Sequence, residues 1–145
     1  MIQTRADLSN ARRVVVKIGS SLLADAESGI RQDVIDHLVD ELAGFIAAGM
    51  QVVLVTSGSV ALGRVRLGWL DRELSVHEKQ AAAAIGQPKL MRAYGRAFDR
   101  HGLSVAQMLL TKDDLRHRRR YLNTSNTSET LFAVGVVPIV NENDT

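Results

Sequence analysis

The sequence predicts an α/β fold in which helices cover a mainly parallel β-sheet. Three observations support this prediction. Four short apolar runs, rich in β-branched residues, have the length of buried strands; helical patterns separate them; and each run ends in a cluster of small polar or acidic residues. This is the order of elements that successive βαβ units require.

The first βαβ unit occupies residues 14–55. Residues 14–18 form an apolar run that ends in a Gly-Ser-Ser turn, and residues 52–55 form the second run. Between them, apolar residues at helical spacing over 34–46 predict an amphipathic helix. Because a helix separates the two runs, we expect a right-handed crossover that places them parallel in one sheet.

Less regular patterns predict the remaining elements. Residues 76–101 are rich in alanine, but Gly86 and Pro88 interrupt the helical pattern, so we expect two helical pieces or one kinked helix. A third strand, a further helix and a fourth strand are predicted over residues 105–110, 123–133 and 136–140. Pro138 predicts an edge or strand-start position for the last strand.

Composition narrows the class of protein. A length of 145 residues, with 46% hydrophobic and 23% charged residues, is typical of one globular domain. The net charge of +2 gives no indication of nucleic-acid binding. The chain has no cysteine, which excludes disulfides and thiolate metal sites and fits a cytoplasmic location. We expect no signal peptide and no membrane span, because no apolar run approaches about 18 residues.

Polar residues cluster where the predicted strands end. In open parallel sheets, ligands bind outside the carboxyl ends of the strands. The residues expected there are Lys17, Gly19 and Ser20 at the first strand, Ser57 and Gly58 at the second, and Asn141 and Asp144 at the fourth. These three clusters outline one predicted site.

The first cluster suits phosphate. Gly19 allows backbone N–H groups to approach phosphate oxygens, and Lys17 supplies the mobile positive charge that phosphoryl transfer requires. The alternative is a lysine that extends from a strand end into solvent and a glycine that only turns the chain. The residues of this cluster leave both interpretations open.

The other two clusters suit an acidic small molecule. The segment after Ser57 and Gly58 resembles the start of a helix, and helix amino termini attract anions; an ordinary serine N-cap is the alternative. Asn141 and Asp144 belong to a group of amide and carboxylate side chains suited to bind an ammonium and a carboxylate by directed hydrogen bonds. A solvated turn is the alternative for this group.

Several familiar motifs are absent from the sequence. It contains no Walker P-loop, no G-x-G-x-x-G after a strand, no H-E-x-x-H and no protein-kinase motif. The four histidines are scattered, and we predict no metal site in the chain. We interpret the basic run 116–120 as a solvated loop, or as one that meets an anionic ligand or partner subunit, rather than as a nucleic-acid patch.

Six ordered sequence blocks resemble those of one known family. They are VVVKIGSS (14–21), VTSGSVALGR (55–64), AAIGQ (83–87), QMLLT (107–111), RRRYLN (118–123) and VVPIVNENDT (136–145). Together they resemble the amino-acid kinase superfamily and, within it, the glutamate 5-kinase family, over residues 12–145. The resemblance implies a three-layer αβα sandwich around a mainly parallel sheet.

The resemblance also implies an activity. The reaction would transfer the γ-phosphoryl group of ATP to the side-chain carboxylate of L-glutamate, the first step of proline biosynthesis, with Mg²⁺ as the metal. Lys17 would stabilise charge on the transferring group, with Gly19 and Ser20 as nearby donors to ATP. Ser57, Asn141 and Asp144 match the family's glutamate-binding positions, Asp144 being suited to the α-ammonium group. Gly58 belongs to the loop of Ser57, where backbone N–H groups would bind the substrate. The full-length form would be a homo-oligomer.

The family pattern continues beyond these six blocks. We therefore expect residues 1–145 to be the amino-terminal, substrate-binding part of a truncated kinase domain, without its nucleotide-binding half, without a PUA domain, and inactive alone. Two alternatives stay open. One is another acid kinase of the superfamily, acting on N-acetylglutamate, aspartate or carbamate. The other is a non-catalytic acid-binding module.

Overall fold

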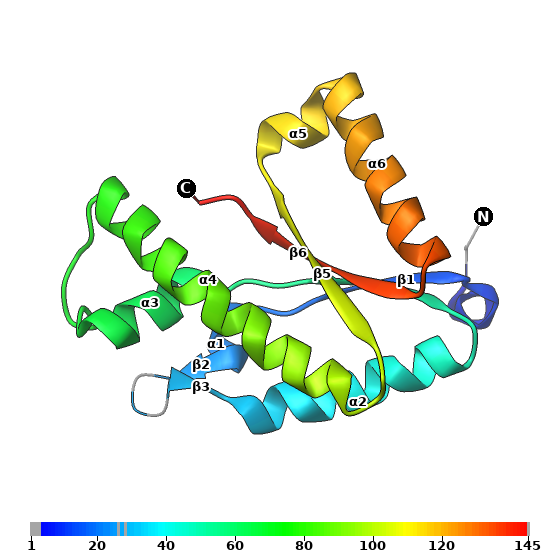
Figure 1. The fold of residues 1–145 in the computed structure, drawn as a ribbon, viewed down its shortest axis with the longest axis horizontal. Helices are drawn as coiled ribbons and strands as arrows, with labels where there is room; N and C mark the ends of the chain where they lie inside the picture. Colours follow the sequence, from blue (N-terminus) through cyan, green and yellow to red (C-terminus); the bar gives the residue numbers. More distant parts are fainter. Residues whose placement is uncertain (1–3, 26, 28, 145) are drawn as a thin grey trace.

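The main sheet contains four parallel strands. The computed structural model describes residues 4–25, 27 and 29–144, so Thr145 of the last sequence block lies outside the described residues. Every neighbouring pair in the sheet is parallel, and the strands lie in the order β1 (Arg13–Lys17), β4 (Gln51–Val55), β6 (Val136–Glu142) and β5 (Ser104–Leu110) (Figure 1). The predicted βαβ unit is confirmed as parallel, since β1 pairs with β4.

Helices cover both faces of this sheet. The longer ones are α2 (Gln32–Ala47), α3 (Ser59–Leu67), α4 (Val76–Asp99) and α6 (Arg118–Ala133). Shorter elements are the 3-10 helix η1 (Arg5–Asn10), α1 (Ser20–Leu23), α5 (Lys112–Arg116) and an antiparallel hairpin of β2 (Ala24–Asp25) and β3 (Gly29–Ile30).

Two adjacent residues of β5 show how the layers are arranged. Gln107 forms a hydrogen bond with Gln87 of α4, whereas Met108 accepts one from Ser128 of α6. Successive side chains of a strand point to opposite faces. Helices α4 and α6 therefore lie on opposite faces of the sheet, in the three-layer arrangement that Figure 1 shows.

The core lies between the sheet and the layer of α2 and α4. From the sheet, Leu54 is fully buried and Ile139 is 1% exposed. From α4, Tyr94 and Phe98 are fully buried and lie four residues apart, on one face of the helix. Burying each such side chain contributes roughly 1.5–3 kcal/mol. This layer therefore holds β4 and β6 in place relative to α4.

Helix α4 continues through Pro88. It begins at a capping box in which Ser75 and Glu78 each accept a hydrogen bond from the other's backbone N–H. Pro88 leaves the carbonyl of Ala84 without its helical partner. Because Ala84 is exposed, water can bind that carbonyl. Of the two predicted alternatives, the one with a single helix is correct.

The prediction that Pro138 marks an edge or a strand start is wrong, because it lies in the middle of the inner strand β6. The carbonyl of Val140 accepts from the N–H of Thr56, at the end of β4. In a strand, residues two apart point their backbone N–H and C=O groups toward the same neighbouring strand. Pro138 lies two residues before Val140, so the side of its backbone that lacks an N–H group faces β4. The β4–β6 pairing begins only at Leu54 and Ile139. Pro138 thus lies just before the ladder that would need its donor.

The basic run 116–120 is not a loop. Arg116 ends α5 and Arg118 begins α6, five residues before the predicted start at Asn123. Helix α6 has no buried residue, so no apolar spacing indicates where it begins. All five side chains of the run are exposed, as expected.

Among the helices of the described ranges, none has an apolar stretch long enough to cross a membrane.

Candidate functional site

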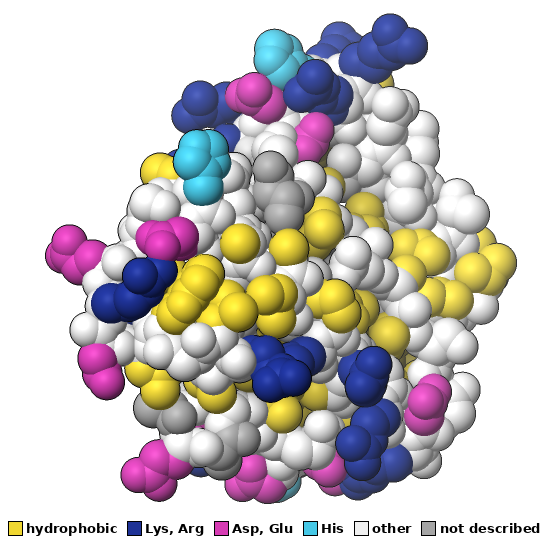
Figure 2. Space-filling model, turned by 60° about the vertical axis from the view of Figure 1, so that its left-hand side comes forward, with side chains coloured by type: hydrophobic (Ala, Val, Ile, Leu, Met, Phe, Trp, Pro, Cys, Tyr) yellow, Lys and Arg dark blue, Asp and Glu magenta, His cyan; other side chains and the backbone are white. Residues whose placement is uncertain are grey.

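The carboxyl ends of the strands lie toward one side of the molecule. In Figure 1 this is the left-hand side, where β6 approaches the C-terminus and α3 follows β4. Figure 2 brings that side forward and shows hydrophobic side chains in the middle of the face, with Lys, Arg, Asp and Glu side chains around them. An apolar centre with a polar rim is typical of small-molecule sites.

The turn between β4 and α3 is hydrogen-bonded to, and packs against, the segment that follows β1. Ser57 Oγ donates to the carbonyl oxygen of Ile18 at 3.3 Å. Gly58 has a φ of 108°, in the left-handed region that favours glycine, and a Cβ added to it would lie 3.6 Å from the Cα of Ser20. Gly58 is also the N-cap residue of α3, without a side-chain cap. The alternative of an ordinary serine N-cap is therefore wrong.

A buried hydrogen bond supports this turn from below. The hydroxyls of Thr56 and Tyr94 lie 2.9 Å apart. Burial raises the pKa of Tyr94 to about 12, and the hydrogen bond with Thr56 opposes that shift. Tyr94 is therefore a neutral hydroxyl in the core, and it ties the residue before Ser57 to α4.

Two glycines allow α3 and α4 to touch through their backbones. A Cβ added to Gly63 would lie 1.9 Å from the carbonyl oxygen of Ala82, and one added to Gly86 would lie 1.7 Å from that of Ser59. Backbone atoms cannot move aside as a flexible side chain can. The crossing therefore holds Ser59, the first residue of α3, close to Gln87, the residue after Gly86.

Five of the seven predicted site residues line one hollow of about 340 Å³, which we call the Ser57 hollow. Its lining residues are Ser20, Ser57, Gly58, Ser59, Val60, Ala61, Arg64, Asn141, Glu142 and Asp144. Three of them form the first turn of α3, whose amino terminus carries a partial positive charge. Lys17 and Gly19 are not among the lining residues.

Asp144 lies at the border of this hollow, next to a like charge. Partial burial raises the pKa of its carboxyl group above the usual range, and the negative charge of Glu142 raises it further. Ser59 Oγ donates to Asp144 Oδ2 at 3.4 Å, which opposes the shift. Two neighbouring carboxylates favour a cation, such as an ammonium group, between or beside them.

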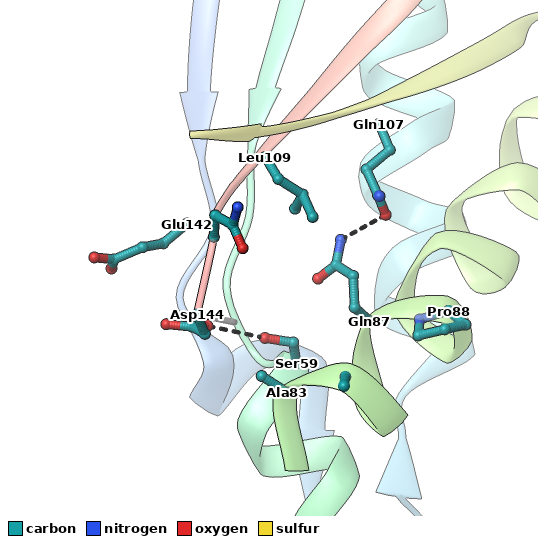
Figure 3. A pocket seen from close by; sticks show the side chains of 10 residues that line it. Ser59, Ala83, Gln87, Pro88, Gln107, Leu109, Glu142 and Asp144 are labelled. Atoms are coloured by element: carbon teal, nitrogen blue, oxygen red, sulfur yellow. Dashed lines mark hydrogen bonds between the residues drawn. The ribbon is translucent and has the colours of Figure 1, made fainter. Parts of the chain in front are cut away.

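A second hollow, of about 200 Å³, adjoins the first, and we call it the Gln87 hollow. Ser59, Glu142 and Asp144 line both hollows. The other lining residues are Ala83, Ala84, Gln87, Pro88, Gln107, Leu109 and Asn143. Figure 3 shows Asp144 and Ser59 on one side and the amides of Gln87 and Gln107 on the other.

Sequence reasoning assigns no role to Gln87 or Gln107. The only signal for them is their place in the blocks AAIGQ and QMLLT, which carry the family resemblance without indicating a role. The spatial reason is that Gln87 comes from a helix and Gln107 from a strand, so their meeting depends on how α4 packs on β5.

Lys17 lies apart from both hollows. It is the last residue of β1, and its exposed side chain belongs to the same strand face as Val15, which is 63% exposed. Within the described ranges, the Lys17 side chain has no hydrogen bond or ion pair. The phosphate-binding roles of Lys17, Gly19 and Ser20 stay predictions, as do the substrate-binding roles of the other cluster residues.

No metal centre accompanies these hollows in residues 4–25, 27 and 29–144. That part of the chain has no group of three or more His, Cys, Asp or Glu side chains arranged to hold a metal ion. The chemistry that the site itself offers is recognition of anions by N–H groups and of cations by carboxylates.

Comparison with known sequences identifies relatives of the chain. Residues 12–145 match the Amino acid kinase family. The chain is 52% identical to a glutamate 5-kinase of Thioalkalivibrio sulfidiphilus, 54% to one of Chromohalobacter salexigens and 55% to one of Caulobacter vibrioides. These alignments cover 100%, 98% and 93% of this chain, but 39%, 38% and 36% of the relatives. The chain thus spans less than two fifths of their length.

Solved structures confirm the predicted α/β fold. A carbamate kinase of Giardia has a TM-score of 0.59 at 12% identity, covering 90% of this chain and 60% of that one. An isopentenyl phosphate kinase of T. acidophilum, in a product complex, has a TM-score of 0.57 at 18% identity, covering 87% of this chain and 53% of that one. At these identities the likeness concerns the fold alone.

Proposed function

This chain belongs to the amino acid kinase family, and we propose that it forms the acid-binding part of an ATP-dependent kinase for L-glutamate. The product would be L-glutamyl 5-phosphate, in the first step of proline biosynthesis. Residues 1–145 would supply the amino-terminal, substrate-binding part of the kinase domain. The proposal includes a cytoplasmic homo-oligomer that takes Mg²⁺ together with ATP.

The observation that carries this proposal is that the Ser57 hollow has groups that can bind an anion and groups that can bind a cation. The uncapped first turn of α3 offers N–H groups to a carboxylate. Asp144 and Glu142 offer negative charge to an ammonium. An amino acid carries both groups. The relatives named glutamate 5-kinase support glutamate as the particular acid.

The proposed reaction needs few protein groups. An oxygen of the glutamate side-chain carboxylate attacks the γ-phosphorus of ATP, and the bond from that phosphorus to the β-phosphate oxygen breaks, so that ADP leaves. The acid is already ionised, so no proton is transferred. Lys17 would stabilise negative charge on the transferring group, with the N–H groups of Gly19 and Ser20 beside it.

The metal belongs to the nucleotide in this proposal. Mg²⁺ would neutralise charge on the ATP phosphates, which supply most of its ligands in many kinases, together with water. The residues of this chain hold the acid, and Asp144 would bind its α-ammonium group.

The experiment that tests the proposal is an ADP-release assay on the longest natural form of the chain. L-glutamate, aspartate, N-acetylglutamate and carbamate are compared at equal concentrations. We expect release with L-glutamate alone. Release with aspartate but not glutamate would overturn the choice of substrate. Glutamate binding without ADP release would indicate the non-catalytic acid-binding module instead.

A further inference from the structure

Three side-chain amides that line the two hollows form a hydrogen-bonded chain. Asn141 Nδ2 donates to Gln87 Oε1 at 2.7 Å, and Gln87 Nε2 donates to Gln107 Oε1 at 3.0 Å. The amides come from β6, α4 and β5. Asn141 is 5% exposed and Gln87 is 9% exposed, so neither can exchange these partners for bulk water.

The direction of this chain of amides is set at one end. The backbone N–H of Glu142 donates to Asn141 Oδ1 at 2.8 Å. A backbone N–H can only donate, so the oxygen of Asn141 must face it and its NH₂ group must face Gln87. Gln87 must then accept with its oxygen and donate with its nitrogen.

The consequence appears at the other end. Gln107 accepts from Gln87 through Oε1, so its Nε2 is the group that remains available to a ligand. Gln107 is exposed, and it lines the Gln87 hollow beside Gln87 (Figure 3). The hollow therefore presents an N–H donor on the Gln107 side and carboxylate oxygens on the Asp144 side.

We propose that Gln87 is a positioning residue that fixes the hydrogen-bond polarity of this site, so that Gln107 offers a donor to a carboxylate of the bound acid. The inference rests on the proposed function, because it names the group that the site recognises. Gln87 does not itself have to touch the acid. It acts through the orientation of Asn141 and Gln107.

The backbone around Gln87 is built to keep its amide in place. Its neighbour Gly86 lies against the carbonyl of Ser59, where a Cβ would be 1.7 Å away. Helix α4 therefore cannot rotate or slide at this position without separating from α3. A fixed helix and two fixed strands leave the three amides one mutually satisfied arrangement.

The decisive substitution is Gln87→Glu. A carboxylate still accepts from Asn141, but it cannot donate to Gln107, whose amide must turn and present its oxygen to the hollow. We expect the KM for L-glutamate to rise about 10-fold or more, with kcat changed less than about threefold. Gln80→Glu is the matched control, on the same helix and outside both hollows, and it should leave KM unchanged.

A double-mutant cycle separates polarity from simple charge repulsion. In the unmodified protein, Gln107→Met should raise the KM for L-glutamate about 10-fold, because a donor to a charged group is lost. In the Gln87→Glu background the same change should have an effect of about twofold or less, since Gln107 no longer offers a donor. Multiplicative effects would show that Gln87→Glu acts by charge alone and would overturn the proposal.

Two further measurements keep the test independent of folding and of activity. If Gln87→Glu does not fold, Gln87→Met replaces it, and this change frees the Gln107 amide to rotate. In that background, Gln107→Met should raise the KM for L-glutamate by about half as many fold as it does in the unmodified protein. Proton exchange of side-chain amides, followed by NMR without any ligand, should be slow for Asn141 and Gln87 and fast for Gln107. Fast exchange at Gln87 would contradict the amide chain itself, whereas absence of glutamate-dependent ADP release would contradict only the proposed function.

Discussion

The side of the candidate site that would bind the acid and the side that would bind phosphate differ in how far their side chains are buried and hydrogen-bonded. On the acid side, Thr56, Ser59 and Asn141 are 4%, 3% and 5% exposed, and each has a hydrogen-bond partner in the protein. On the phosphate side, Lys17 and Ser20 are exposed, and α1 begins without a side-chain cap. Buried, hydrogen-bonded side chains suit recognition of one small molecule, whereas an exposed lysine suits charge that develops during the reaction.

The largest expected effect comes from breaking the acid side at its scaffold, with Gly86→Ala. The added Cβ would meet the Ser59 carbonyl, so α3 must move away from α4. Overpacking of this kind costs about 1–3 kcal/mol and occasionally more, and contact with backbone places this site at the upper end. We expect a lower Tm in thermal unfolding and loss of glutamate binding in a calorimetric titration.

Gly95→Ala is the control on the same helix. A Cβ there meets nothing within 4 Å, and alanine is about 0.5–1 kcal/mol better than glycine within a helix. Its Tm should equal or exceed that of the unmodified protein. Equal Tm values for the two variants would mean that the close crossing of α3 and α4 does not exist.

On the phosphate side the expected effect is on turnover. Lys17→Ala removes one cation from a developing negative charge, and loss of one such stabilising group costs about 10²–10³-fold in kcat. The Tm should not change, because the Lys17 side chain has no partner within the described ranges. Kinetics with L-glutamate and ATP measure the effect. Lys89 is another exposed lysine outside both hollows, and Lys89→Ala should leave kcat unchanged. An equal fall in kcat for both variants would contradict the proposed role of Lys17.

The fold was more predictable than the site because local patterns determine most of its elements. The strand 14–18 and the helix 34–46 agree with β1 and α2 within a residue or two, since both bury regular apolar faces. Helix α6 begins earlier than predicted because it buries no residue. Pro138 misleads because its effect depends on which neighbour its missing donor faces.

Within the site, residues at the carboxyl ends of strands could be predicted, whereas those on α4 could not. Asn141 and Asp144 follow a strand, so the general rule for parallel sheets brings them to the same edge. Gln87 lies in the interior of a helix, and its place in the block AAIGQ, unlike that of Gln80, carries a family resemblance but indicates no role. Its place depends on the α3–α4 crossing, which is a tertiary contact through Gly86.

Asp144→Asn tests the electrostatics of the acid side. Loss of a charged partner for the substrate ammonium should raise the KM for L-glutamate about 10- to 100-fold. In the unmodified protein KM should rise as pH falls through the raised pKa of Asp144, at a higher pH than for an ordinary aspartate. The asparagine variant should lose the part of this pH dependence that comes from Asp144 and keep the part that comes from the carboxyl group of L-glutamate itself, so KM of the two proteins is compared across the acid range.

The same raised pKa fixes the sign of the effect on stability. The folded state binds the Asp144 proton more tightly than the unfolded state, so the carboxyl group favours folding below its unfolded pKa and loses that contribution as pH rises through its folded pKa. At neutral pH Asp144→Asn should therefore keep or raise the Tm. A large fall in Tm would show that Asp144 supports the fold rather than the ligand.

The smallest expected effect is that of Tyr94→Phe, beneath the turn that carries Ser57. The change removes the hydroxyl that pairs with Thr56, but Thr56 keeps a second bond, to the Ser57 carbonyl at 3.3 Å. The cost should therefore be about 1 kcal/mol, as for an ordinary hydrogen bond, with KM for L-glutamate raised less than about fivefold. Denaturant unfolding measures the loss of stability, and kinetics measure the change in KM.

The chain has one other tyrosine, the exposed Tyr121, and Tyr121→Phe should change neither quantity. A spectroscopic titration adds an independent reading: the tyrosine that titrates at a pKa of about 12 should vanish only in Tyr94→Phe. If that signal vanished in Tyr121→Phe instead, Tyr94 would not be the buried tyrosine, and its buried hydrogen bond with Thr56 would be contradicted.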